Sequence, residues 1–197
     1  MPPRSARPDD AQATAAAATL AAWIAEEEAV RARVDGGAGP GVLSPAQLAG
    51  SDGLATLQAM LRGELPYPAI AQTLDFALVE VDAGRALFQG RPLPRHLNPM
   101  GGIHGGWFAT LLDSCVGCAV HSALPAGKTY TTVELKVNMV RALTDKVPLV
   151  RAEGRIIHLG RSMGTADGRL VGHDGTLYAH ASTTCFIFDL PAEKPPR

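Results

Sequence analysis

The sequence predicts an α+β fold, in which an antiparallel sheet packs against one long buried helix and a helical extension precedes this core. Residues 107–120 are apolar on every side, which is typical of a helix that is buried all round. Four strand-like segments follow Gly127 with no helical pattern between them, so neighbouring strands are expected to pair antiparallel. Residues 1–65 contain two helical patterns and a glycine-rich run between them.

The N-terminal extension is predicted to cover residues 1–65, with a disordered start at residues 1–10. Residues 11–34 are rich in alanine, the best helix former, and carry apolar side chains near one face. Glycine and proline then form a linker at residues 36–41. Two interpretations of this extension are open: a helical arm that packs on the core, or a lid or oligomer contact with a direct role in function.

A second helix is predicted to begin at Ser44 and to continue through residues 54–61. Pro45 favours the first helical turn, and Gln47 lies three residues after Ser44, which makes a capping box. Apolar side chains follow on one stripe, and glycine and proline then stop the pattern.

The core domain is predicted to span residues 66–190, followed by a tail at residues 191–197. The apolar side chains of residues 74–81 alternate, but their phase slips, which indicates either a β-bulge or a strand covered on both faces. Asp-Ala-Gly at residues 82–84 predicts a turn, and residues 86–88 the returning strand. A proline-containing loop leads from there into the central helix.

Four further strands are predicted after the helix, and Asp174-Gly175 is a strong signal for a hairpin between the last two. The predicted strands are residues 129–140, 148–159, 162–171 and 177–188. Residues 129–140 are rich in valine and threonine, which favour extended backbone.

Composition and charge exclude several classes of function. The net charge of −1 gives no electrostatic case for nucleic-acid binding. No run approaches the roughly 20 strongly apolar residues of a membrane span, and Asp9 and Asp10 interrupt a basic start at Arg4 and Arg7 that would otherwise suggest a signal peptide. Three cysteines are an odd number without a visible pairing framework, which favours a reducing, cytoplasmic location.

The central helix carries two candidate reactive features. Glycine pairs at 101–102 and 105–106 keep the backbone bare at its N-terminus, where free amides and the helix dipole stabilise an anion. Asp113 is the one charged residue of the apolar run, and a buried lone carboxylate must be paired, protonated or used in chemistry. Both features also have structural explanations: tight packing of the glycines, and an Asp113 bonded to backbone or to a threonine.

The spacing of these two features predicts a symmetric dimer. Gly105 and Asp113 are about 12 Å apart along one helix axis at the usual rise per residue. A carbonyl held at the Gly105 amide therefore does not reach Asp113 of the same chain. A second copy of the helix, antiparallel across a two-fold axis, brings the partner's Asp113 to this place, and does so twice in each dimer.

The motif His104-Gly105-Gly106, with Asn98 six residues before the histidine and Asp113 nine residues after it, resembles the hotdog-fold thioesterases of the PaaI-like (phenylacetate-pathway) group. Later segments that also resemble this family are residues 130–138, 160–161 and 177–181. The resemblance extends over residues 66–189. It implies a sheet wrapped around the central helix, an acyl-CoA thioesterase activity, and a homodimer or homotetramer.

The resemblance implies a role for several residues. The Gly105 N–H is expected to form an oxyanion hole for the charge that develops on the thioester oxygen, with Asn98 as an added side-chain donor. Asp113 is expected to act either as a base that activates water or as a nucleophile that forms an anhydride. Thr132, or less favourably Thr131, is expected to position the water.

Three further positions belong to the expected site. His104 is tempting as a general base, but its place just before the helix favours a hydrogen-bonding role for its ring, and the resemblance implies that its backbone region matters more. Coenzyme A phosphates are expected to bind Arg161 and Ser162, with Arg141 as a second candidate. The opposing interpretation is that these arginines are ordinary solvated residues at strand ends.

No metal and no redox cofactor is expected, and coenzyme A enters as part of the substrate. Cys115 and Cys118 form a Cys-x-x-Cys pattern, which can bind a metal or carry out redox chemistry. The pattern lies inside an apolar helix and has no second cysteine pair, so the two cysteines are interpreted as small buried residues. The alternative function is a non-catalytic acyl-CoA-binding or regulatory protein with the same fold. A hotdog dehydratase or hydratase is disfavoured, because the histidine motifs associated with those enzymes are not seen.

Overall fold

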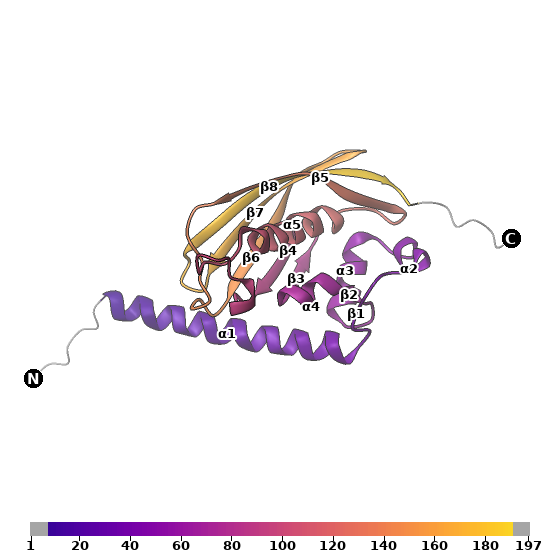
Figure 1. Cartoon of the computed structure of the whole chain (residues 1–197). Helices are drawn as coiled ribbons and strands as arrows, with labels where there is room; N and C mark the ends of the chain where they lie inside the picture. Colours follow the sequence, from indigo (N-terminus) through magenta and orange to yellow (C-terminus); the bar gives the residue numbers. More distant parts are fainter. Residues whose placement is uncertain (1–7, 191–197) are drawn as a thin grey trace, which may run out of the picture.

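The computed structural model describes residues 8–190, and its core is a six-stranded sheet that curves around helix α5, Gly105–His121 (Figure 1). The strand order is β3-β4-β6-β7-β8-β5, and every neighbouring pair is antiparallel. The strands are β3 Phe76–Asp82, β4 Arg85–Gly90, β5 Lys128–Met139, β6 Val150–Leu159, β7 Met163–Gly172 and β8 Leu177–Asp189. This architecture confirms the predicted α+β class and the hotdog fold. The predicted tail at residues 191–197 lies outside the described residues, as do residues 1–7.

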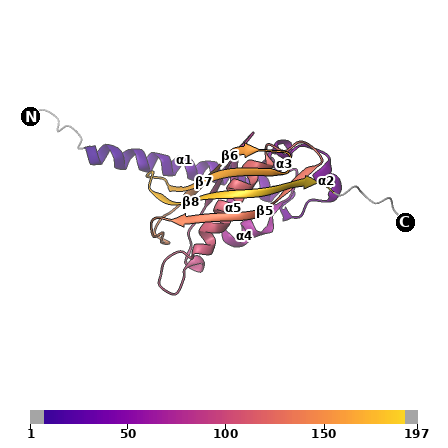
Figure 2. The ribbon, with the colours of Figure 1, turned by 90° about the horizontal axis from the view of Figure 1, so that it is seen from above.

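Every predicted strand is present, and the phase slip in the first one is a β-bulge. The pairing of β3 with β4 shifts between Leu78 and Glu80, so the bulge was the correct interpretation. The predicted hairpin turn between β7 and β8 is also present, and Gly175 adopts a φ of 81° there, a left-handed conformation that suits glycine. Figure 2 shows β6, β7, β8 and β5 side by side across α5.

Helix α5 is buried along most of its surface, as the sequence predicts. Leu111, Leu112 and Val116 are fully enclosed by the sheet. The sheet approaches closely where β6 carries Gly154, since a Cβ there would lie 2.2 Å from the carbonyl oxygen of Cys115. One stripe of α5 is different: it contains Gly106, Ala109, Thr110 and Asp113, and it is exposed or only partly buried within one chain.

The four helices that precede the sheet form an N-terminal arm, residues 8–74, which lies on the far side of α5 from β8 and β5 (Figure 1). They are α1 Pro8–Gly36, α2 Pro45–Ala49, α3 Gly53–Leu61 and α4 Ala69–Leu74. The capping box at Ser44 is confirmed, because the Gln47 N–H donates to the Ser44 hydroxyl and the Ser44 N–H donates to the Gln47 side chain. No helix within residues 8–190 is long and apolar enough to span a membrane.

Two local predictions for this part of the chain are wrong, and two further features were not predicted. Residues 8–10 belong to α1 rather than to a disordered start. The helix from Ser44 is interrupted at residues 50–52, and Asp52 starts α3 anew by accepting a hydrogen bond from the Ala55 N–H at 2.8 Å. Part of the linker pairs as a short strand, β1 Pro40–Gly41, parallel to β2 Tyr67–Pro68. Helix α4 was not predicted at all.

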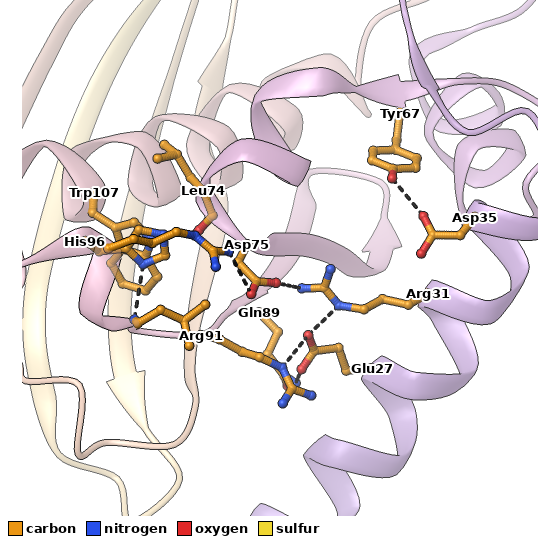
Figure 3. A network of polar contacts seen from close by, with 12 residues as sticks. Glu27, Arg31, Asp35, Tyr67, Leu74, Asp75, Gln89, Arg91, His96 and Trp107 are labelled. Carbon is orange, nitrogen blue, oxygen red and sulfur yellow. Dashed lines mark hydrogen bonds and ion pairs between the residues drawn. The ribbon is translucent and has the colours of Figure 1, made fainter.

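A buried polar network fastens α1 to the core (Figure 3). The Glu27 carboxylate has no solvent exposure and accepts hydrogen bonds from Arg31 at 2.6 Å, Gln89 at 2.7 Å and Arg91 at 3.1 Å. Arg31 also donates to Asp75 at 2.7 Å. Because Gln89 and Arg91 come from β4 and its following loop, the network supports the interpretation of the extension as an arm packed on the core.

Candidate active site

The loop before α5 is organised by Asn98. Its backbone N–H donates to the Gly102 carbonyl at 2.7 Å, and its side-chain oxygen accepts from the N–H groups of Met100 at 2.9 Å and Gly102 at 3.3 Å. The side-chain NH₂ of Asn98 donates to no group within residues 8–190. Asn98 therefore shapes the loop with its oxygen and keeps a donor available.

His104 caps α5 and leaves the first amide of the helix unpaired. Its Nδ1 accepts from the Gly106 N–H at 2.9 Å, so the neutral ring carries its proton on Nε2. The Gly105 N–H has no acceptor in the part of the chain that the structure describes. Met139 packs close to Gly105, because a Cβ on Gly105 would lie 2.9 Å from the Met139 methyl carbon. The Gly105 N–H is therefore unpaired, and the lack of a side chain at this position leaves space beside it.

Asp113 is paired with Thr132 in the same chain. The Thr132 hydroxyl donates to Asp113 Oδ1 at 3.0 Å, and both residues are partly buried. Thr131 is exposed, so the strand register favours Thr132 as the hydroxyl partner. A bulge in β5 between Thr132 and Glu134 lies directly beside this contact. Asp113 is half-buried on the open stripe of α5 rather than enclosed in the core.

The free amide and the carboxylate lie at different places along α5. Strand β5 runs antiparallel to the helix, with Thr132 beside Asp113 and Met139 beside Gly105. The eight residues between Gly105 and Asp113 correspond to about 12 Å of helix. The structure therefore brings Asp113 and Thr132 together, and it keeps Gly105, with the neighbouring His104, apart from them.

The open stripe of α5 adjoins an unpaired sheet edge. Strand β5 is the last strand of the sheet and pairs only with β8 among the described strands. Large apolar side chains on and just after β5 are exposed, including Val133 at 60% and Val140 at 54%. An exposed apolar edge strand is an unusual surface for a protein that remains a monomer.

The residues expected to bind coenzyme A phosphates do not form one cluster within a chain. Arg161 and Ser162 lie in the exposed turn between β6 and β7, at the end of the sheet where β5 begins. Arg141 follows the other end of β5, where its N–H donates to the Tyr178 carbonyl at 3.2 Å. Arg161 is thus at the same end of the sheet as Thr132, whereas Arg141 is near the end that carries Gly105.

A cavity of about 390 Å³ lies between the N-terminal arm and the core, and sequence reasoning missed it. Helices α1, α3 and α4 line one side, and β3, β4, β5 and α5 line the other. Asp113, Ser114, Cys118 and His121 line it along α5. The apolar stripe of residues 54–61 was the available signal, but nothing in the sequence indicates which surface that stripe faces.

Burial controls the ionisable groups near Asp113. It raises the pKa of the Cys118 thiol to about 12, and it raises the pKa of Cys115 as well, so both are protonated thiols. Burial also lowers the pKa of His121, which keeps this imidazole neutral. Within residues 8–190 no three acidic, histidine or cysteine side chains are grouped so as to hold a metal ion.

The sequence is similar to a thioesterase family and to a protein described as an esterase. Residues 100–179 match the family model of the thioesterase superfamily. A Halobacterium salinarum protein described as an esterase is 35% identical over 78 residues, which are 38% of this chain and 49% of that protein, so the chain matches about half the length of this curated relative.

Solved structures extend the likeness over most of the core. A Ralstonia eutropha JMP134 protein, described as a thioesterase related to phenylacetic acid degradation, is 33% identical with a TM-score of 0.60, and the match covers 66% of this chain and 97% of that protein. A Streptococcus mutans protein bound to acetyl-CoA shares the fold at 23% identity and a TM-score of 0.54, over 60% of this chain and 92% of its own.

Proposed function

The chain belongs to the thioesterase superfamily, and we propose that it is an acyl-CoA thioesterase that hydrolyses a thioester to a carboxylate and free coenzyme A. One observation carries the proposal: a single helix presents an unpaired amide at Gly105 and a carboxylate, Asp113, that is held by the Thr132 hydroxyl. Coenzyme A is the proposed carrier because the Streptococcus mutans protein of the same fold binds acetyl-CoA.

The Gly105 amide is suited to the thioester oxygen. This oxygen gains negative charge as the carbonyl carbon becomes tetrahedral, and a fixed N–H at a helix N-terminus stabilises that charge. The free NH₂ of Asn98 is proposed as a second donor. His104 contributes by accepting a hydrogen bond from the Gly106 N–H. This bond fixes the geometry of the first helical turn and leaves the Gly105 N–H free.

Asp113 is proposed to activate the attacking group. As a base, it takes a proton from water while the water oxygen bonds to the carbonyl carbon, the carbon–sulfur bond breaks and the thiolate leaves to be protonated. As a nucleophile, it attacks the carbonyl carbon itself, the carbon–sulfur bond breaks and the thiolate leaves to be protonated, and water then hydrolyses the resulting anhydride to release the carboxylate and restore Asp113. In both cases Thr132 holds one carboxylate oxygen and leaves the other free to react.

We propose that each site combines two subunits of a homodimer, with Gly105 from one and Asp113 of the partner subunit. The separation of about 12 Å between these positions along one helix supports this arrangement, as do the open stripe of α5 and the exposed edge of β5. Antiparallel packing of two such stripes across a two-fold axis creates two equivalent sites.

The direct test measures thiol release from short, medium, long-chain and aryl acyl-CoAs, with wild type beside Asp113→Asn. We expect turnover of at least one class, and a loss of two or more orders of magnitude in kcat in the variant, equivalent to about 3 kcal/mol of barrier. Asp167→Asn, an exposed acid on β7, is the matched control. Binding without any turnover by wild type would overturn the proposal in favour of a non-catalytic acyl-CoA-binding protein.

Complementation tests the composite site. Asp113→Ala and Gly105→Pro subunits are each expected to be inactive, since proline is tolerated at the first helical position but has no N–H. Random mixing should restore about a quarter of wild-type activity, because half of the dimers then hold one intact site. Gly105→Ala retains the N–H and controls for contact with Met139. Confirmed heterodimers without activity would contradict the two-subunit arrangement.

A further inference from the structure

The candidate reactive carboxylate lies in the wall of the cavity between the arm and the core. Asp113, Ser114, Cys118 and His121 line this cavity along α5. A group bonded to a carbonyl carbon at Asp113 can therefore extend into the cavity without leaving the chain.

The remaining lining is mostly apolar and comes largely from the arm. Leu57, Met60 and Ala71 contribute from α3 and α4, and they face Phe76 and Phe88 of the first two core strands. Ile70 on α4 also lines the cavity and is 49% exposed, so the enclosure is open to solvent at this helix. An apolar chain inserted here replaces water against apolar side chains, which is favourable.

From these contacts we infer that the cavity is the acyl-binding pocket and that it selects large, uncharged, apolar acyl groups. The inference rests on the proposed thioesterase function. A cavity of about 150 Å³ is enough to hold benzene, and this one measures about 390 Å³. It therefore fits an aryl group or an aliphatic chain of roughly eight to twelve carbons.

The charges around the cavity explain the exclusion of charged acyl groups. The charged side chains among its lining residues are Arg31, Asp35 and Asp113. Arg31 is bound to Glu27 and Asp75, and Asp35 accepts from the Tyr67 hydroxyl at 2.7 Å. No cation is thus left to pair with a carboxylate at the far end of an acyl chain, and burying an unpaired charge is unfavourable.

The test compares acyl-CoAs that differ only in chain length or in one terminal carboxylate. Wild type should prefer decanoyl-CoA to acetyl-CoA by at least about tenfold in kcat/KM, since each buried methylene adds severalfold in affinity. It should also prefer decanoyl-CoA to ω-carboxydecanoyl-CoA by at least about tenfold, because burying an unpaired carboxylate is unfavourable. Ala71→Phe fills the cavity and should lower the decanoyl-to-acetyl ratio at least about tenfold. Met60→Ala enlarges it and should shift the preference to longer chains, which keeps the test informative if Ala71→Phe does not fold.

The matched control is Ala17→Phe, the same substitution on an exposed part of α1, and it should leave the ratio within about twofold. If Ala71→Phe and Met60→Ala both fold and both leave the decanoyl-to-acetyl ratio unchanged, the pocket assignment is overturned.

Binding of decyl-CoA and ethyl-CoA thioethers, which are not hydrolysed, distinguishes failure of the pocket assignment from failure of the proposed thioesterase function. Wild type that shows no turnover but binds the decyl thioether more tightly than the ethyl thioether, with this preference lost in Ala71→Phe, would support the pocket and contradict the thioesterase proposal. Equal binding of the two thioethers by wild type would overturn the pocket assignment.

Discussion

Glu27 shows how a buried charge is kept stable in this protein. Burial raises the pKa of its carboxyl, but hydrogen bonds from Arg91, Gln89 and Arg31 outweigh burial and lower the pKa below its usual 4.5. Glu27→Ala should lower the free energy of unfolding by about 2–4 kcal/mol, because it removes a buried acceptor that two arginines and a buried amide share. Urea unfolding followed by tryptophan fluorescence measures this.

The neighbouring residue supplies the control for that substitution. Glu28 is exposed, so Glu28→Ala should change the free energy of unfolding by no more than about 0.5 kcal/mol. Equal effects of the two substitutions would show that the Glu27 network does not stabilise the attachment of the arm.

The lowered pKa of Glu27 also predicts a pH dependence. A carboxyl whose folded pKa lies below its unfolded value stabilises the fold above the unfolded pKa, and this contribution is lost as pH falls through the folded pKa. The free energy of unfolding of wild type should therefore decline below about pH 4.5. Glu27→Gln should show a smaller decline over the same range, measured by urea unfolding at each pH. Parallel curves for the two proteins would contradict this prediction.

Thr132 is expected to act on the reaction through Asp113. Thr132→Val removes the hydroxyl that donates to the carboxylate and should lower kcat about 10- to 100-fold, the range for a lost hydrogen bond to a charged group. Thr132→Ser keeps the donor and should retain most of the activity. Steady-state kinetics with one acyl-CoA decides, and similar losses in both variants would indicate that the methyl group, not the hydroxyl, matters.

At the scale of single helices and strands, the sequence was informative where the local signal was strong. The alternating strands, the Asp174-Gly175 turn and the capping box at Ser44 are all confirmed, because each depends on neighbours in the chain. Helix α4 was missed: it has six residues and no side-chain cap, and helices this short depend on tertiary contacts. The break before α3 was not predicted, because the apolar stripe of residues 54–61 does not show where its helix begins, and Asp52, which caps α3, lies just before the stripe.

The cap at Asp52 gives a prediction for α3. Asp52→Ala removes the acceptor for the Ala55 N–H and should destabilise the protein by about 0.5–2 kcal/mol, whereas Asp52→Asn retains a side-chain oxygen and should be nearly neutral. Thermal unfolding followed by circular dichroism measures both. If Asp52→Asn lowers the stability as much as Asp52→Ala does, the charge of Asp52, rather than its hydrogen bond to the Ala55 N–H, stabilises the protein.

For the whole molecule, the sequence predicted the fold but not the cavity. The central helix, the sheet around it and the Asp113–Thr132 pair follow from one contiguous region and its family resemblance. The cavity joins side chains from Val30 to Tyr130 that come from helices and strands far apart in the chain. Single-sequence patterns show that a stripe is apolar, yet they do not show which surface it packs against.

The two-subunit arrangement also predicts the effect of a substitution on the open stripe of α5. Ala109→Arg places a charged side chain at the proposed contact between two α5 helices and should both dissociate the dimer and remove activity. Ala126→Arg, in the exposed loop after α5, should do neither. Light scattering and thiol release measure the two properties. An active monomer would contradict the proposal that two chains form each site.

The cavity has one wall from the N-terminal arm, whereas Gly105, Asp113 and Thr132 all belong to the core. Substitutions in α3 and α4 can therefore change which acyl group fits without moving the groups proposed to react. Selection on the arm and selection on the core act on different stretches of the gene. Relatives that share the core but differ in their N-terminal helices should consequently diverge in acyl preference faster than in reaction chemistry.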